Sequence, residues 1–254
     1  MTDSVIAAQL YTVREFLKTP ADIATTLKKI SDIGYKAVQV SGMGPIEPAE
    51  LKKIADDNGL AIVSTHIPYE RMRDDFDAVV AEHKLWNCEY PGIGGLPVSY
   101  RNAEGFVRFA KEASEVARRF KEHGLTFVYH NHSFELEKFG DRTGLQILYE
   151  ESDPEAFTAE IDTYWIQHGG GDPAWWIRSL KGRAHVVHFK DMTMKGTTQL
   201  FAEVGEGNLN WPAILDACKE AGVRWHIVEQ DVCQRDPFES LAISLRNLNK
   251  MGLK

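Results

Sequence analysis

The chain has 254 residues, of which 29 are Lys or Arg and 37 are Asp or Glu, so its formal net charge at pH 7 is -8. A nucleic-acid or anionic-membrane partner requires a concentrated cationic surface, and the scattered basic residues of this acidic chain argue against both. The 3 cysteines are far apart in the sequence and provide neither a disulfide framework nor a paired-cysteine metal site.

The length of the chain matches one (β/α)8 barrel, for which about 250 residues is typical. No Pro/Ser-rich linker or charge block divides it, so we expect a single domain over residues 1–254. The opening Met1-Thr2-Asp3-Ser4 lacks the basic start and apolar stretch of a secretion signal, and no segment offers the run of about 20 apolar residues that spans a bilayer. A cytoplasmic location is therefore expected.

Short apolar runs alternate with longer helical patterns along the whole chain, which is typical of parallel strands joined by crossover helices. The predicted strands are Val5–Leu10, Ala37–Val40, Ala61–Thr65, Asn87–Tyr90, Thr126–Tyr129, Phe157–Ile161, Ala184–Phe189 and Trp225–Val228. Predicted helices end at glycines such as Gly34 and begin near prolines such as Pro20, as helix caps favour. The pattern predicts a (β/α)8 TIM barrel. An open doubly wound sheet is the alternative, although no GxGxxG follows the first strand.

The ends of the predicted strands carry polar side chains. In a (β/α)8 barrel the active site lies where the strands end and the βα loops begin. The polar residues at these positions are Gln9, Tyr11, Gln39, His66, Glu89, His130, His132, Asp162, His188, Lys190 and Glu229. Such groups are costly to bury unless they are paired or bind a metal, so their convergence predicts a functional site.

Several motifs resemble those of a known superfamily. They are Gln9-Leu10-Tyr11, Tyr129-His130-Asn131-His132-Ser133-Phe134-Glu135, Glu160-Ile161-Asp162-Thr163-Tyr164-Trp165, Val187-His188-Phe189-Lys190-Asp191, Gly205-Glu206-Gly207 and Val228-Glu229-Gln230-Asp231. Over nearly the whole chain they resemble the xylose isomerase-like sugar phosphate isomerase/epimerases, which are related to the inosose dehydratase and 3-dehydroshikimate dehydratase branches. The resemblance implies a TIM barrel that binds one divalent metal ion and acts on a small carbohydrate.

The positions that match the superfamily's metal ligands are His130, Asp162, His188 and Glu229. Relatives typically have Glu where this chain has His130. A mixed set of imidazoles and carboxylates favours Mn²⁺, with Co²⁺, Zn²⁺ and Fe²⁺ as alternatives and Mg²⁺ less favoured. His132 lies two residues after His130, on the same side of an extended strand, so either could be the ligand. The positional match favours His130.

The resemblance implies proton transfer next to a carbonyl through an enediolate that the metal stabilises. Relatives often use two Glu ligands as bases on opposite faces of the sugar, and only Glu229 of that pair is present here. We therefore predict that Glu229 is both ligand and base, and that His132 or Lys190 serves the opposite step. The residues predicted to bind substrate are Gln9, Tyr11, His66, Glu135 and Trp165.

The first functional hypothesis is a sugar or sugar phosphate isomerase/epimerase. The alternative is a dehydratase or β-elimination lyase on a keto-sugar or cyclitol, because the two dehydratase branches also place histidines after strand 5. The acidic charge disfavours a metal-dependent nuclease of the same fold, and the four filled ligand positions disfavour an inactive sugar-binding protein. The sequence leaves open the sugar, its phosphorylation and whether the chain forms a homo-oligomer.

Overall fold

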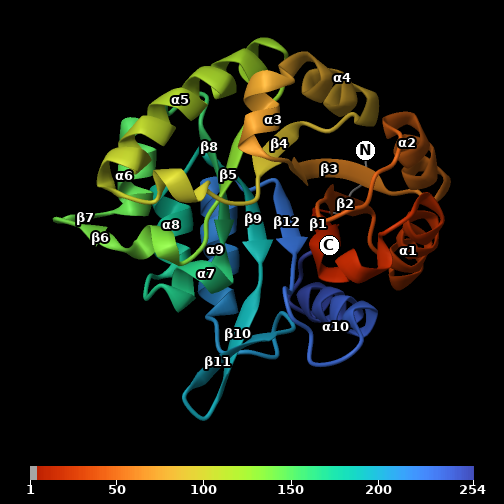
Figure 1. Cartoon of the computed structure of the whole chain (residues 1–254). Helices are drawn as coiled ribbons and strands as arrows, with labels where there is room; N and C mark the ends of the chain where they lie inside the picture. The colour runs from red at the N-terminus through yellow and green to blue at the C-terminus, as the bar shows by residue number, and fades with distance from the viewer. Residues whose placement is uncertain (1–4) are drawn as a thin grey trace.

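In the computed structural model, which describes residues 5–254, eight parallel strands close into a barrel surrounded by helices (Figure 1). In chain order the barrel strands are β1 (Ile6–Gln9), β2 (Ala37–Val40), β3 (Ala61–His66), β4 (Tyr90–Ile93), β5 (Val128–His130), β8 (Thr158–Asp162), β9 (Ala184–Phe189) and β12 (Trp225–Val228). β12 pairs with β1 and closes the barrel, which confirms the predicted TIM barrel. The expectation about a secretion signal rested on Met1–Ser4, which lie outside the described residues.

Helices follow the strands and cover the outside of the barrel (Figure 1). They are α1 (Pro20–Ile33), α2 (Pro48–Asp57), α3 (Tyr69–Asp74), α4 (Phe76–Trp86), α5 (Ala103–Glu122), α6 (Gly144–Glu151), α7 (Thr163–His168), α8 (Pro173–Ser179), α9 (Trp211–Ala221) and α10 (Pro237–Lys250). Local sequence fixes their starts: Thr19 and Asp22 form a capping box at α1, and the Asp172 carboxylate accepts from two backbone amides of α8. Within residues 5–254 no helix has the length and apolar character to cross a membrane.

The interior of the barrel changes from apolar to polar along the strands. An apolar cluster contributed by different strands fills the half nearer the strand starts, with Ala7, Ala37, Val128, Val186 and Ile227 among its members. Successive side chains of a strand alternate between its two faces, so the residues two positions later also point inward. These residues are Gln9, Gln39, His130, His188 and Glu229. The strand period therefore places a polar layer directly above the apolar one, at the mouth of the barrel.

The fourth strand begins three residues later than the sequence predicted. Asn87 has a left-handed backbone with φ of 54° and ends α4, and the strand runs from Tyr90 to Ile93. Glu89 consequently lies before the strand, at the opposite end of the barrel from the mouth. There its carboxylate accepts a hydrogen bond of 2.9 Å from Arg224. The expectation that Glu89 stands at a strand end facing the site is therefore wrong.

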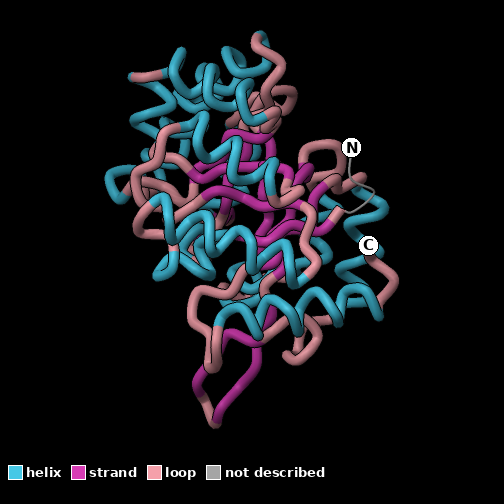
Figure 2. Tube along the Cα trace, turned by 90° about the vertical axis from the view of Figure 1, so that its right-hand side faces the viewer, coloured by secondary structure: helices cyan, strands magenta, loops and turns pink. Residues whose placement is uncertain are grey.

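Two antiparallel hairpins extend the loops at the mouth: β6 (Lys138–Phe139) with β7 (Arg142–Thr143), and β10 (Asp191–Lys195) with β11 (Thr198–Ala202). The β10–β11 hairpin projects from the body of the molecule in both views (Figures 1 and 2). It begins directly after Lys190, so the hairpin sets the direction in which the backbone leaves β9. The sequence did not predict either hairpin.

His83 of α4 makes the fold sensitive to acid. It is fully buried, its Nδ1 donates to the Val79 carbonyl at 2.7 Å, and its Nε2 accepts from the Thr65 hydroxyl at 2.8 Å. Burial lowers its pKa to about 4. Because the unfolded state then binds the proton more readily, this contribution to stability is present above about pH 6.5 and is lost as the pH falls towards the folded pKa.

We therefore expect His83 to remove about 2 kcal/mol from the free energy of unfolding between pH 7 and pH 5. Urea denaturation at the two pH values measures the loss. In the His83→Gln variant the loss should be smaller by about that amount, since Gln does not titrate. Equal losses in the variant and the original chain would show that His83 does not carry the effect.

Candidate metal centre and active site

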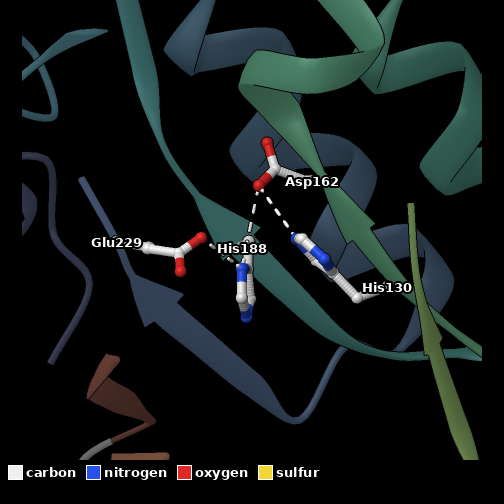
Figure 3. Close-up of side chains that lie close together, drawn as sticks. All are labelled: His130, Asp162, His188 and Glu229. Carbon is white, nitrogen blue, oxygen red and sulfur yellow. Dashed lines mark hydrogen bonds and ion pairs between the residues drawn. The ribbon is translucent and has the colours of Figure 1, made fainter. Parts of the chain in front are cut away.

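Four ionisable side chains from neighbouring strands point toward one another at the barrel mouth (Figure 3). They are His130 at the end of β5, Asp162 at the end of β8, His188 in β9 and Glu229 directly after β12. Their ligand atoms all lie within 4.8 Å of one another, and all four side chains are buried. His130 Nε2 is 3.1 Å from Asp162 Oδ2, and His188 Nδ1 is 3.0 Å from Glu229 Oε2. The structure thus brings together the four residues that the motifs singled out.

Gln39 determines which nitrogen of His188 faces this group. The Gln39 amide nitrogen donates to a carboxylate oxygen of Glu160 at 2.6 Å, and a carboxylate can only accept there. The amide oxygen of Gln39 must then face His188 Nε2, 2.7 Å away, so Nε2 carries the proton and donates it. The nitrogen that can give up its proton and offer a lone pair to a cation is therefore Nδ1, on the side of Asp162 and Glu229. This orientation leaves His188 able to bind a cation.

The donor set fits a divalent cation. Two imidazole nitrogens and two carboxylates from four separate strands form a compact group, and Gln39 orients one imidazole with its Nδ1 toward the carboxylates. Buried carboxylates at such short separation require compensating positive charge. The mixed nitrogen and oxygen donors suit a first-row transition metal better than Mg²⁺.

Glu160 is a buried carboxylate that the sequence reasoning missed. It lies two residues before Asp162 in β8 and therefore one inward layer deeper. It contacts His66 Nε2, and its Oε1 lies 3.2 Å from His188 Nε2. Burial favours the neutral acid, but the neighbouring His188 and His66 hold its pKa well below the usual value. The signal available in the sequence was its position two residues before Asp162, because residues two apart in a strand point to the same face.

Lys190 is almost fully buried among carboxylates. Its ammonium lies 2.7 Å from Glu229, 3.1 Å from Asp162 and 3.0 Å from Asp231. Burial alone would favour the neutral amine, but these three carboxylates raise the pKa of Lys190, so it stays charged. Its charge and that of His188 lower the pKa of Glu229 against the effect of burial.

Asp191 follows Lys190 in the sequence, but it is not one of the carboxylates that contact the Lys190 ammonium. Its Oδ2 accepts from the Trp211 indole at 2.6 Å and from the Gly205 amide at 2.9 Å. A Cβ at Gly207 would lie 2.4 Å from Asp191 Oδ1, so glycine is required at that position. The Gly205-Glu206-Gly207 motif therefore wraps around a structural carboxylate.

His132 and Glu135 belong to the same loop but have different environments. Burial lowers the pKa of His132 to about 3, so its imidazole is neutral. The Glu135 carboxylate is fully buried, and burial raises its pKa to about 7. It accepts from the Tyr129 hydroxyl at 2.8 Å and from the His132 backbone amide at 2.9 Å. Glu135 thus anchors the backbone of His132 through this hydrogen bond.

A cavity of about 460 Å³ lies at the mouth beside these groups. Of the residues predicted to act in the site, it is lined by Tyr11, His66, His130, His132, Lys190 and Glu229. Arg14, Ser41 and Asp231 also line it, and the sequence reasoning did not select them. A larger cavity of about 670 Å³ lies at the opposite end of the barrel, near Trp86 and Trp225. Its Glu89 and Arg224 pair with each other, whereas His130, His132, Lys190 and Glu229 line the smaller cavity.

The remaining predicted substrate residues lie outside the cavity lining. Gln9 is fully buried beneath it and donates to Gln39 at 2.7 Å. Glu135 lies behind His132, as described above. The ring of Trp165 lies 5.3 Å from that of His132, and the Lys190 ammonium lies 5.3 Å from the Trp165 ring. Trp165 therefore borders two of the groups that line the cavity.

Comparisons with known proteins agree with this architecture. The chain is 25% identical to the rhizopine catabolism protein MocC of Rhizobium meliloti, over 89% of this chain and 80% of the relative. It is 26% identical to an inosose dehydratase of Mesomycoplasma hyopneumoniae, over 92% of this chain and 91% of the relative.

Among solved structures, a sugar phosphate isomerase/epimerase from Parabacteroides distasonis aligns with a TM-score of 0.79 at 22% identity, covering 100% of this chain and 96% of the other. This likeness bears on the fold alone. The model of the xylose isomerase-like TIM barrel family matches residues 27–250. The chain therefore belongs to the xylose isomerase-like TIM barrel family.

Proposed function

We propose that the protein is a divalent-metal-dependent lyase that acts on a keto-sugar or keto-cyclitol by β-elimination. The observation that carries this proposal is the pairing of two chemically different groups at the site: the carboxylate of Glu229 and the ammonium of Lys190 lie 2.7 Å apart beside one cavity. Elimination needs one group that accepts a proton and one that donates a proton. The similarity to an inosose dehydratase over 92% of the chain supports the same class.

His130, Asp162, His188 and Glu229 would hold the cation, and Mn²⁺ is the ion we favour, with Co²⁺, Zn²⁺ and Fe²⁺ as alternatives. When bound, the cation would polarise the substrate carbonyl and offset the negative charge that develops on its oxygen. The protein residues supply the proton transfers.

Glu229 is the group placed to take the proton. Its contacts with His188 and Lys190 both use Oε2, so Oε1 serves as the acceptor. The C–H bond next to the carbonyl breaks, the proton passes to Glu229 Oε1, and the electron pair forms an enediolate. When the carbonyl re-forms, a C=C bond forms and the C–O bond at the β-carbon breaks.

Lys190 is the group placed to protonate the departing oxygen. For a hydroxyl leaving group the product is water, which can carry the proton from Glu229 back to Lys190 and so restore both groups. Trp165 and Phe201 border the ammonium, at 5.3 Å and 5.6 Å from their ring centres, and help to exclude other water. Each turnover then converts the substrate to an unsaturated ketone and one water.

An isomerase or epimerase is the second candidate, and His132 is the observation that favours it. Its neutral imidazole lines the cavity, and it can move a proton at a second position of the substrate. Glu229 would take the proton and His132 would serve its return to another carbon or to the other face. Net loss of water distinguishes the two reactions.

We expect the Mn²⁺-loaded protein to form vinylic products from keto-cyclitols or keto-hexoses. Proton NMR in D₂O monitors the reaction. Elimination gives new vinylic signals and an ultraviolet absorption of the conjugated ketone. Chelator-treated protein serves as the control and should give neither. Exchange of the proton next to the carbonyl without vinylic product would instead support the isomerase/epimerase.

A further inference from the structure

Lys190 uses the same carboxylate oxygens that face the candidate metal ligands. Its ammonium contacts Asp162 Oδ2 at 3.1 Å and Glu229 Oε2 at 2.7 Å. Asp162 Oδ2 also faces His130 Nε2, and Glu229 Oε2 also faces His188 Nδ1. A divalent cation between these ligands and the ammonium would therefore require the same two oxygens. Because like charges repel strongly at such separations in a buried site, the cation and the ammonium compete for these two oxygens.

Asp231 is the carboxylate around Lys190 that does not belong to the metal group. Its Oδ1 lies 3.0 Å from the ammonium, and its side chain is 21% exposed and lines the cavity. It follows Glu229 by two residues in the loop after β12. It therefore offers Lys190 a position nearer to the substrate space.

Hydrogen bonds hold the backbone of Lys190, and its ammonium stands at the end of a long side chain with several rotatable bonds. The Lys190 amide donates to the Thr163 hydroxyl at 3.1 Å, and the Thr163 hydroxyl donates to the Lys190 carbonyl at 2.8 Å. Four methylene groups separate this anchor from the ammonium, so the charge can be redirected by rotation of the side chain. No change in the course of the chain is needed.

We propose that Lys190 is the internal counter-ion of Asp162 and Glu229 while the metal group is empty, and that it moves to Asp231 when a divalent cation binds. This inference rests on the proposed metal centre. Before binding, Lys190 offsets the charge of carboxylates that would otherwise be buried without a partner. After binding, Asp231 holds the ammonium toward the cavity, where it donates to a substrate oxygen. Asp231 is thus a positioning residue that acts through Lys190.

The inference predicts opposite effects of two substitutions on the affinity of the metal-free full-length chain for Mn²⁺, measured by titration calorimetry. Lys190→Met removes the competing charge and should bind Mn²⁺ about 10-fold more tightly. Asp231→Asn removes the alternative partner of the ammonium and should bind about 10-fold more weakly. In the double variant the effect of Asp231→Asn should disappear, because no ammonium remains to be moved. Metal-free Lys190→Met should also melt at a lower temperature.

Lys195→Met, an exposed lysine in the β10–β11 hairpin, is the matched control and should leave the affinity unchanged. If Lys190→Met does not fold, Lys190→Gln removes the same charge with a polar side chain. Absence of Mn²⁺ binding by the original chain would overturn the proposed metal centre together with the inference. Normal binding with unchanged or weaker affinity in Lys190→Met would overturn the inference alone. An equal effect of Asp231→Asn in both backgrounds would show that Asp231 acts by its charge and not through Lys190.

Discussion

Glu229→Gln is expected to lower the turnover by about 1,000-fold while the barrel remains folded. The substitution removes the carboxylate that we propose as the proton acceptor. An amide oxygen can still accept from His188 and Lys190, whose contacts with Glu229 are 3.0 Å and 2.7 Å, so the buried hydrogen bonds survive. Turnover of an established substrate and incorporation of solvent deuterium next to its carbonyl should fall together.

Two controls separate the roles of Glu229. Glu203→Gln changes a buried glutamate that accepts from Ser240 at 2.8 Å, away from the cavity, and should keep normal turnover. The metal content of Glu229→Gln, measured by elemental analysis, distinguishes a lost ligand from a lost base. Full activity with undiminished deuterium exchange in Glu229→Gln would contradict the proposed mechanism.

The sequence predicted the barrel because each strand is a short apolar run between helical patterns. The predicted position of the fourth strand was three residues too early because the residues of the actual strand resemble a turn. Pro91 and Gly92 lie within it, and these residue types usually interrupt strands. Gly92 is there for close packing, since a Cβ would lie 2.8 Å from the Thr65 carbonyl oxygen. That requirement comes from the neighbouring strand and is invisible in the local sequence.

The strand ends predicted the polar residues at the mouth, but not the layers within it. Glu160 and Asp162 lie on the same side of one strand, and the sequence does not tell which carboxylate reaches the other ligands. Arg14 lies in the 3-10 helix that follows β1 (Leu10–Phe16) and Asp231 lies in the loop after β12, so no strand period applies to either. The Arg14 guanidinium donates to the Asp231 carbonyl at 3.0 Å, across 217 residues of sequence. Such long-range contacts depend on how the loops fold over the barrel.

His130→Ala and His132→Ala should affect metal binding very differently. His130 Nε2 lies 3.1 Å from Asp162 Oδ2 and its ligand atom belongs to the compact group of four, whereas His132 lines the cavity beside that group. We expect His130→Ala to weaken Mn²⁺ binding by about 100-fold or more, since even residues that only support a ligand contribute 10- to 100-fold. His132→Ala should keep most of the affinity and lose turnover. Equilibrium dialysis with elemental analysis measures both affinities.

His185→Ala is the matched control for this pair, because His185 lies near the start of β9, at the opposite end of the barrel from the mouth. Its Mn²⁺ affinity should equal that of the original chain. If His132→Ala loses the metal and His130→Ala retains it, the two histidines have exchanged roles, and His130 becomes the group that transfers a proton. If both variants retain full affinity, Asp162, His188 and Glu229 suffice to hold the cation. The fourth position would then be open to the substrate, and the departure from the family's glutamate would affect the chemistry without affecting the affinity for the metal.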